Sequence, residues 1–291
     1  MLKYWMLLLL LLLSACSSST PVATPAAERT YFFPEIGHTV QPPFSSFFEK
    51  PGKLDLLGYP ITEAFADGGW QVQYFQFGRL EYHPENEPDY HITVGWLGES
   101  LNRTTPPSEH DICGAFADFY RTNGDSVQFG KPISRAFLFE GRLVQDFQSA
   151  RFIWMPDEPA TVLLEPIGET YFLQHHSINL LRPIEAPDDA LVFFVGRPAP
   201  APTTLHCKAI VERTTVPALY RVGIALKDEA DAPLRGYSTI AKIGTNQWLL
   251  PPTLKNGRAH LLISIPQNET RVSLTIKGSE TPLCEGSFPP Q

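Results

Sequence analysis

The strongest constraint on the fold of this chain is an internal repeat in its sequence. Residues 47–84 align without a gap on residues 119–156, at an offset of 72, and 14 of the 38 aligned positions are identical. The match resumes two residues out of step at Leu97-Gly98 and Ile167-Gly168. Chance does not produce such agreement, so the sequence predicts two copies of one structural unit.

Each copy begins with the pattern of short helices. Aromatic residues recur at helical spacing in both copies, at Phe44, Phe47 and Phe48 and again at Phe116, Phe119 and Tyr120. Glycine follows each stripe and is expected to cap the helix at its C-terminal end, at Gly52 and Gly124. A Gly-x-Pro-Ile turn comes next, after which Thr62 or Ser134 is expected to cap a second helical turn.

Strands are expected in the second part of each copy. Residues 71–82 are rich in β-forming residues around Gly78 and predict two strands with a tight bend. A further strand over residues 91–97 completes the unit. Each copy is therefore expected to be α+β, with short helices and a small antiparallel sheet.

The segment from Phe47 to Pro84 resembles a known family of repeats. Its Gly58-Tyr59-Pro60-Ile61, Gln73-Tyr74-Phe75 and Glu81-Tyr82-His83-Pro84 are similar to the LGFP-like repeat of exported bacterial envelope proteins. The resemblance covers about residues 31–170, and the second copy departs from it at Lys131, Asp146 and Met155. It implies cell-wall or surface attachment without catalysis, with repeat 1 over residues 31–112 and repeat 2 over 113–184.

The remainder of the chain differs from the repeats in composition and in hydrophobic pattern. Residues 185–204 are Pro-rich and predict a stiff linker, although the apolar run 191–195 must be covered by neighbouring structure. Residues 205–291 hold five to seven short alternating segments, which favour an all-β sandwich of immunoglobulin-like type. Cys207 and Cys284 bracket this region and are expected to form a disulfide, whereas Cys113 is expected to remain a free thiol.

The N-terminus predicts export and lipid anchoring. Lys3 precedes an apolar stretch of ten residues, Tyr4 to Leu13, which is too short to span a bilayer. The following Leu13-Ser14-Ala15-Cys16 resembles a bacterial lipoprotein signal, which implies a signal peptide over residues 1–15 and lipidation of Cys16. A signal peptide cut after Ala15 without lipidation is the alternative. Residues 16–30 read as a flexible tether, which places the protein at the outer face of a membrane or at the cell surface.

Charge and motifs narrow the possible functions. The formal net charge is −8, so the chain has no electrostatic reason to bind nucleic acid. It contains no Gly-x-Ser-x-Gly, no Cys-x-x-Cys and no His-Glu-x-x-His motif, and no Gly-rich phosphate loop. We therefore expect no enzymatic activity, no metal and no cofactor. An envelope hydrolase with a carboxylate site in one repeat is the catalytic alternative.

Aromatic and polar residues of the first hairpin are the candidate ligand contacts. Trp70 and Tyr74 align with Arg142 and Asp146 in the second copy, and positions that accept charged residues are expected to be exposed. Phe75, Tyr82 and Trp96 are instead expected to pack in the core. Gln73 and Arg79 recur in the second copy as Gln145 and Arg151, and are interpreted first as partners of the backbone and second as ligand contacts.

These features together predict a non-catalytic surface lipoprotein. Its predicted ligand is a cell-envelope polymer, either glycan or peptidoglycan, or else a surface protein partner. Exposed aromatic faces beside amides and carboxylates are typical of sugar-binding surfaces. A structural spacer or assembly subunit is the remaining alternative, and it requires a flat apolar patch in place of an aromatic one.

Overall fold

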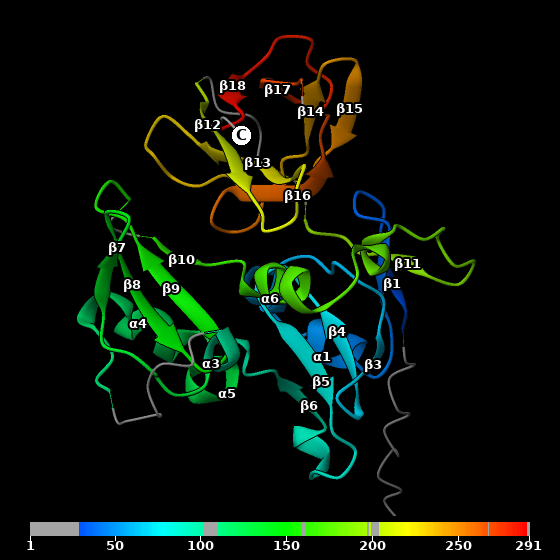
Figure 1. Ribbon diagram of the computed structural model, residues 1–291, viewed down its shortest axis with the longest axis vertical. Helices are drawn as coiled ribbons and strands as arrows, with labels where there is room; N and C mark the ends of the chain where they lie inside the picture. Colours follow the sequence, from blue (N-terminus) through cyan, green and yellow to red (C-terminus); the bar gives the residue numbers. More distant parts are fainter. Residues whose placement is uncertain are drawn as a thin grey trace, which may run out of the picture.

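The computed structural model describes residues 29–101, 110–158, 161–196, 198, 204–266 and 268–289. The predicted signal peptide, the lipidation site Cys16, most of the tether and part of the Pro-rich linker lie outside these residues. The described chain is mostly β, with five small sheets and six short α-helices (Figure 1). This confirms the prediction of small antiparallel sheets with short helices. No helix among the described residues is long and apolar enough to cross a membrane.

The first unit contains a short hairpin, three short α-helices and a four-stranded sheet. Its sheet has the order β3-β4-β5-β6 and is antiparallel throughout. Along the chain the elements are β1 (Tyr31–Phe33), β2 (His38–Val40), α1 (Ser45–Phe48), α2 (Lys53–Leu57), β3 (Phe65–Asp67), β4 (Trp70–Tyr74), β5 (Arg79–Tyr82), the 3₁₀ turn Pro88–Tyr90, β6 (Ile92–Val94) and α3 (Leu97–Leu101).

The second unit repeats this order without the leading hairpin. Its sheet has the order β10-β9-β8-β7 and is likewise antiparallel. The elements are α4 (Gly114–Thr122), α5 (Asp125–Phe129), β7 (Phe137–Phe139), β8 (Arg142–Phe147), β9 (Ala150–Trp154), β10 (Val162–Leu164) and α6 (Ile167–His175), followed by the 3₁₀ turn Ile178–Leu181.

Two details of the helix prediction are wrong, one of them only in part. Gly52 and Gly124 have positive φ, 83° and 104°, and stand at the N-terminal caps of α2 and α5. Gly124 also directly follows Asn123, the C-terminal cap of α4, whereas Gly52 does not adjoin Glu49, the C-terminal cap of α1. Thr62 and Ser134 cap no helix, because their hydroxyls accept the backbone N–H groups of the hairpin strands β4 and β8. The second helix of each unit precedes the Gly-x-Pro-Ile turn and ends at it.

The two units exchange their last helices. Glu99, on α3 of the first unit, donates its N–H to the carbonyl of Gln148 in the hairpin turn of the second unit, at 3.0 Å. Glu169, on α6 of the second unit, donates its N–H to the carbonyl of Gln76 in the first hairpin, at 3.2 Å. α3 also contacts α6, so the exchange joins the two units into one body.

The C-terminal unit consists of seven strands in two antiparallel sheets. One sheet has the order β12-β13-β16 and the other β15-β14-β17-β18. The disulfide Cys207–Cys284 joins β12 to β18, and so it connects the two sheets rather than only the ends of the region. The strands are β12 (His206–Arg213), β13 (Leu219–Lys227), β14 (Thr239–Ile243), β15 (Asn246–Leu249), β16 (Arg258–Ser264), β17 (Arg271–Ile276) and β18 (Cys284–Ser287).

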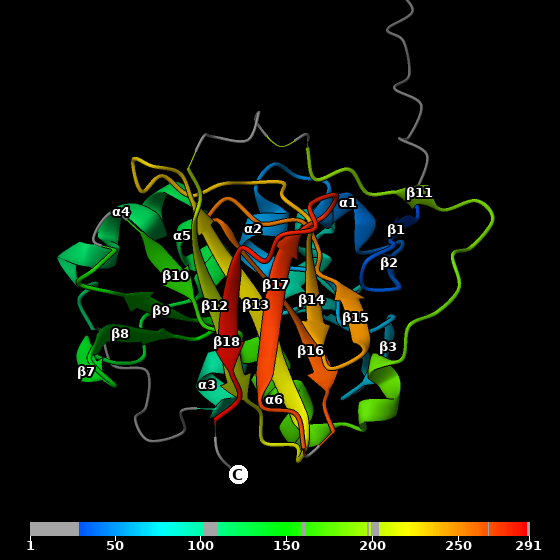
Figure 2. The ribbon, with the colours of Figure 1, turned by 90° about the horizontal axis from the view of Figure 1, so that it is seen from above.

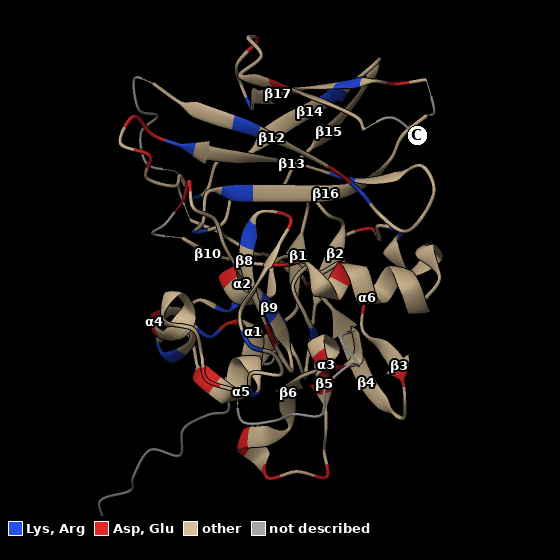
Figure 3. Ribbon diagram, turned by 60° about the vertical axis from the view of Figure 1, so that its left-hand side comes forward, with Lys and Arg blue, Asp and Glu red and all other residues tan. Residues whose placement is uncertain are grey.

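The C-terminal unit packs on the first two. Figure 2 shows its strands over the middle of the molecule, with β7–β10 on one side and β1–β3 on the other. The hydroxyl of Tyr59 donates to the carbonyl of Pro252 at 2.6 Å, and Leu254 is buried in the core of the first unit. Acidic and basic residues are interspersed along all three units (Figure 3), so no unit carries charge of one sign only.

The apolar run before the linker is covered only in part. β11 (Leu191–Val192) pairs in parallel with β1, and Phe193 stacks on Phe33 in the core of the first unit, with ring centroids 5.0 Å apart. Leu191, Val192 and Phe194 remain exposed. The expected packing on a neighbouring unit is therefore made through Phe193 and Val195.

Candidate functional site

One face of the first sheet gathers most of the polar residues of that unit. In the register of the sheet, Asp67 is opposite Trp70, and Tyr74 is opposite Arg79. Successive side chains of a strand point to opposite faces, so residues two apart share a face. Glu81 therefore lies on the same face as Arg79, and this face is directed away from the core of the first unit.

Arg79 is the centre of a network on this face. Its Nε donates to a carboxylate oxygen of Glu81 at 2.9 Å, and its Nη1 donates to Asp67 at 3.2 Å and to the hydroxyl of Tyr74 at 2.9 Å. Burial is the largest single effect and would lower the pKa of Arg79, but the charges and hydrogen bonds of Glu81 and Tyr74 together outweigh it, and the pKa is raised. We call these residues, with those joined to them below, the Arg79 network.

The exchanged helix α6 closes one end of the network. His176, at the end of α6, lies 3.0 Å from the hydroxyl of Tyr74 and 3.5 Å from the carboxylate of Asp67. Burial lowers the pKa of His176 and outweighs the nearby charge of Asp67. Because His176 comes from the second unit, part of the network exists only through the exchange of helices.

The other end of the network reaches solvent at Trp70. His83 bonds Glu81 at 3.0 Å and Glu85 at 2.9 Å, and Glu85 accepts the indole N–H of Trp70 at 3.2 Å. The rings of Trp70 and His83 are 4.6 Å apart. Burial would lower the pKa of His83, yet the hydrogen bonds to the two carboxylates raise it. Trp70 is 40% exposed, so a partly fixed indole faces the solvent.

Tyr74 and Trp96 do not lie where the sequence predicts. Tyr74 is 0% exposed, because α6 covers it with Tyr171 and Phe172, and only its hydroxyl takes part in the network. Trp96 was expected in the core and is 58% exposed. Trp96 follows the end of β6, whereas Trp70 begins β4, and these strands run in the same direction. The two tryptophans therefore mark opposite ends of the sheet.

Gln73 has a structural role in the described molecule. It is buried on the core face, where its Nε2 donates to the carbonyls of Thr39 at 2.6 Å and Thr62 at 2.8 Å. Gln145, its counterpart, donates to the carbonyls of Asp111 and Ser134 at 2.9 and 3.0 Å. Both amides satisfy loop carbonyls that a buried sheet edge would otherwise leave unpaired.

The second unit lacks the aromatic part of this network. Its Arg151, the counterpart of Arg79, bonds Asp146 at 2.5 Å and Glu165 at 3.2 Å. Arg142 replaces Trp70, and the tryptophan at that end of the second sheet, Trp154, stands opposite Leu143 at the position of Tyr82 instead. The repeat comparison singled out Trp70 and Arg79, but it missed Asp67, His83 and His176. Asp67 and His83 are replaced by other residue types in the second copy, and His176 lies outside the hairpin.

Neither a search for metal sites nor a comparison with known proteins assigns a ligand or a family to this region. Within the part of the chain that the structure describes, no group of three or more His, Cys, Asp and Glu residues is arranged to hold a metal ion. The sequence matches no known protein-family model, and no curated protein is significantly similar to it.

Proposed function

We propose that this chain is a lipid-anchored surface protein that binds a glycan-containing polymer of the cell envelope without catalysis. The observation that carries the proposal is the exposed Trp70 at the end of the Arg79 network. An indole held by Glu85 and His83 offers a preformed stacking face, and its carboxylate and imidazole neighbours offer hydrogen bonds to hydroxyl groups. Preorganisation of this kind lowers the entropy lost on binding.

The architecture supports the same proposal. The first two units place Gln73 and Gln145 in equivalent hydrogen bonds and hold equivalent glycines, Gly58 and Gly130, at φ of 72° and 71°. We infer two LGFP-like repeats that share an exchanged pair of helices. The seven strands of the C-terminal unit, in sheets of three and four strands joined by a disulfide, fit an immunoglobulin-like sandwich.

Retention on purified cell-wall polymer tests the binding site. The full chain in mild detergent is expected to sediment with insoluble polymer, and Trp70→Ala is expected to weaken the retention about tenfold, because a stacking face is lost. Tyr74 is left unchanged, since its buried ring supports α6. Trp96→Ala is the matched control: it removes a more exposed indole from the opposite end of the sheet and should leave retention intact.

The outcomes of this experiment separate the alternatives. Equal loss in both tryptophan variants would indicate nonspecific aromatic adsorption and contradict the proposed site. Absence of retention for the unchanged chain would exclude polymer binding. In that case a structural spacer or a surface protein that binds another protein would account better for the architecture.

The lipid anchor has a separate test. Cells that express the chain with a palmitate analogue are expected to label it, and Cys16→Ser is expected to abolish the label, because only a thiol at this position accepts the diacylglycerol. More than one acyl chain is needed for stable membrane attachment, so the variant should also leave the membrane fraction. Unlabelled wild-type chain would favour an ordinary signal peptide cut after Ala15.

A further inference from the structure

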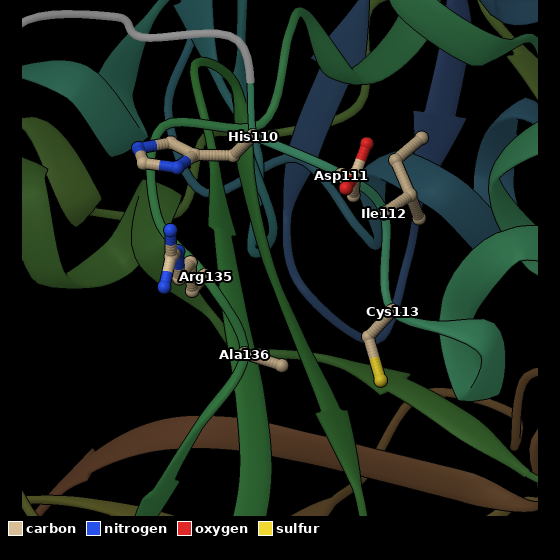
Figure 4. Close-up of a pocket in the computed structure, with 6 residues that line it drawn as sticks. All are labelled: His110, Asp111, Ile112, Cys113, Arg135 and Ala136. Atoms are coloured by element: carbon tan, nitrogen blue, oxygen red, sulfur yellow. The ribbon is translucent and has the colours of Figure 1, made fainter.

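A second region of the molecule, far along the chain from Trp70, combines a basic pocket with an exposed sheet edge. A pocket of about 250 Å³ lies just before β7 (Figure 4) and is lined by His110, Asp111, Ile112, Cys113, Arg135 and Ala136. In the close-up, the guanidinium of Arg135 and the imidazole of His110 lie next to each other on one side. The carboxylate of Asp111 lies on the other side and points away from them.

The charge of this pocket is the reverse of that at the equivalent place in the first unit. There Glu63 stands at the position of Arg135, and its carboxylate binds the N–H of Thr39 at 2.9 Å and the ring of His38 at 3.1 Å. The acid of the first unit is thus satisfied within the chain. Arg135 forms no ion pair with any of the described residues, so its positive charge is available to an external anion.

β7 is an edge strand with apolar side chains in the solvent. It pairs only with β8 in the described sheet, at the end of the order β10-β9-β8-β7. Phe137, Leu138 and Phe139 are 39%, 76% and 43% exposed. In the first unit, the equivalent Phe65 is covered by His176 of the exchanged helix, with ring centroids 5.4 Å apart. An exposed apolar edge is a template for another strand.

We propose that β7 binds the C-terminal end of a partner polypeptide by strand addition, with the terminal carboxylate in the pocket of Arg135 and His110. A strand that pairs antiparallel to β7 ends where β7 begins, which is where the pocket lies. Main-chain hydrogen bonds then provide affinity, and alternate side chains of the peptide lie against Phe137 and Phe139. The geometry therefore selects a free carboxylate and apolar residues at the last and third-last positions. This proposal is independent of polymer binding at Trp70.

Fluorescence anisotropy with short peptides tests the proposal on the full chain in mild detergent. The probe is a pool of labelled hexapeptides that end in a free carboxylate and carry Val, Leu or Phe at the last and third-last positions. We expect the same pool with amidated C-termini to bind about tenfold to a hundredfold more weakly, since a charge-assisted hydrogen bond is lost. Arg135→Gln should reduce binding of the carboxylate pool to the level of the amidated pool.

Two further variants serve as controls for the loss of one positive charge and for the role of the edge strand. Arg121→Gln removes one positive charge from the exposed face of α4, where Arg121 pairs with Asp118, and this variant should bind the peptides like the unchanged chain. Leu138→Asp places a charge on the edge strand and should weaken the binding of both peptide pools. Equal binding of the carboxylate and amidated pools, wild-type binding by Arg135→Gln, or binding of neither pool would overturn the proposal.

Discussion

Replacing Gly168 by alanine is expected to lower the free energy of unfolding by about 3 kcal/mol, the upper part of the usual range for overpacking. Gly168 lies in α6 where this helix crosses the first hairpin. A Cβ atom at this position would lie 2.0 Å from the carbonyl oxygen of Phe75 and 2.7 Å from the backbone nitrogen of Gly78. Backbone atoms cannot rotate away, so α6 must shift or separate from the first unit.

Urea unfolding checks this prediction, with the midpoint compared between variants. Gly98→Ala is expected to have the same effect, because its Cβ would lie 2.1 Å from the carbonyl oxygen of Phe147 in the other hairpin. Gly114→Ala is the matched control: it has open space around its Cβ and lies in the first turn of α4, so it should change stability by less than about 1 kcal/mol. An unchanged midpoint for Gly168→Ala would contradict the close helix crossing.

The two glycines also show what the repeat could and could not predict. The sequence repeats Leu97-Gly98 as Ile167-Gly168, which signals a required close contact in each copy. It does not show which hairpin each helix contacts, because packing within a copy and exchange between copies place the same residue types together. The exchange was therefore missed, and with it the contribution of His176 to the site.

The exposure of the candidate residues was predicted correctly only in part. Trp70 is exposed as expected, but Tyr74 is buried, although its counterpart in the second unit is Asp146. Asp146 is buried too, because Arg151 neutralises it. A charged residue at a repeated position therefore indicates exposure only when no partner of opposite charge shares that face. The sequence of the hairpin does not reveal this partner, because the register of the sheet must be known before two side chains can be placed on the same face.

The strands were more predictable than the caps. The hairpin around Gly78 and the strands of the last unit follow from alternation and turn residues, which are local signals. The disulfide Cys207–Cys284 was also predicted, and is confirmed, from the export signal and the positions of the two cysteines. The glycine caps were predicted only in part, because glycine with positive φ serves either end of a helix: Gly124 follows α4 and begins α5, whereas Gly52 only begins α2.

Replacing Glu169 by glutamine is expected to lower the free energy of unfolding by about 3 kcal/mol, because it removes a carboxylate partner from the buried guanidinium of Arg221. Glu169 is fully buried on α6. One carboxylate oxygen accepts from Nε of Arg221 at 2.7 Å, and the other lies 2.8 Å from Nε2 of His260. Arg221 keeps a second ion pair with Glu212, which places the expected loss at the lower end of the range for breaking buried pairs.

The same carboxylate makes the loss depend on pH. Burial would raise the pKa of Glu169, but the charges of His260 and Arg221 outweigh burial and lower it. An acid with a lowered pKa in the folded state stabilises that state fully above its unfolded value of about 4.3, and loses this contribution as the pH falls through the folded pKa. The difference in stability between the unchanged chain and Glu169→Gln should therefore be constant near pH 7 and shrink below about pH 4.

Glu99→Gln is the control for this experiment, because Glu99 is the counterpart of Glu169 on the other exchanged helix. Among the described residues, its carboxylate accepts only from the Nε2 of Gln148, at 3.0 Å, and it is half-buried, so the substitution should cost less than about 1 kcal/mol at any pH. Glu169 differs because α6 lies between the first sheet and the C-terminal unit (Figure 1): its N–H bonds the carbonyl of Gln76, and its carboxylate bonds Arg221 and His260. A loss at Glu99 equal to that at Glu169 would contradict a special contribution of the buried ion pair.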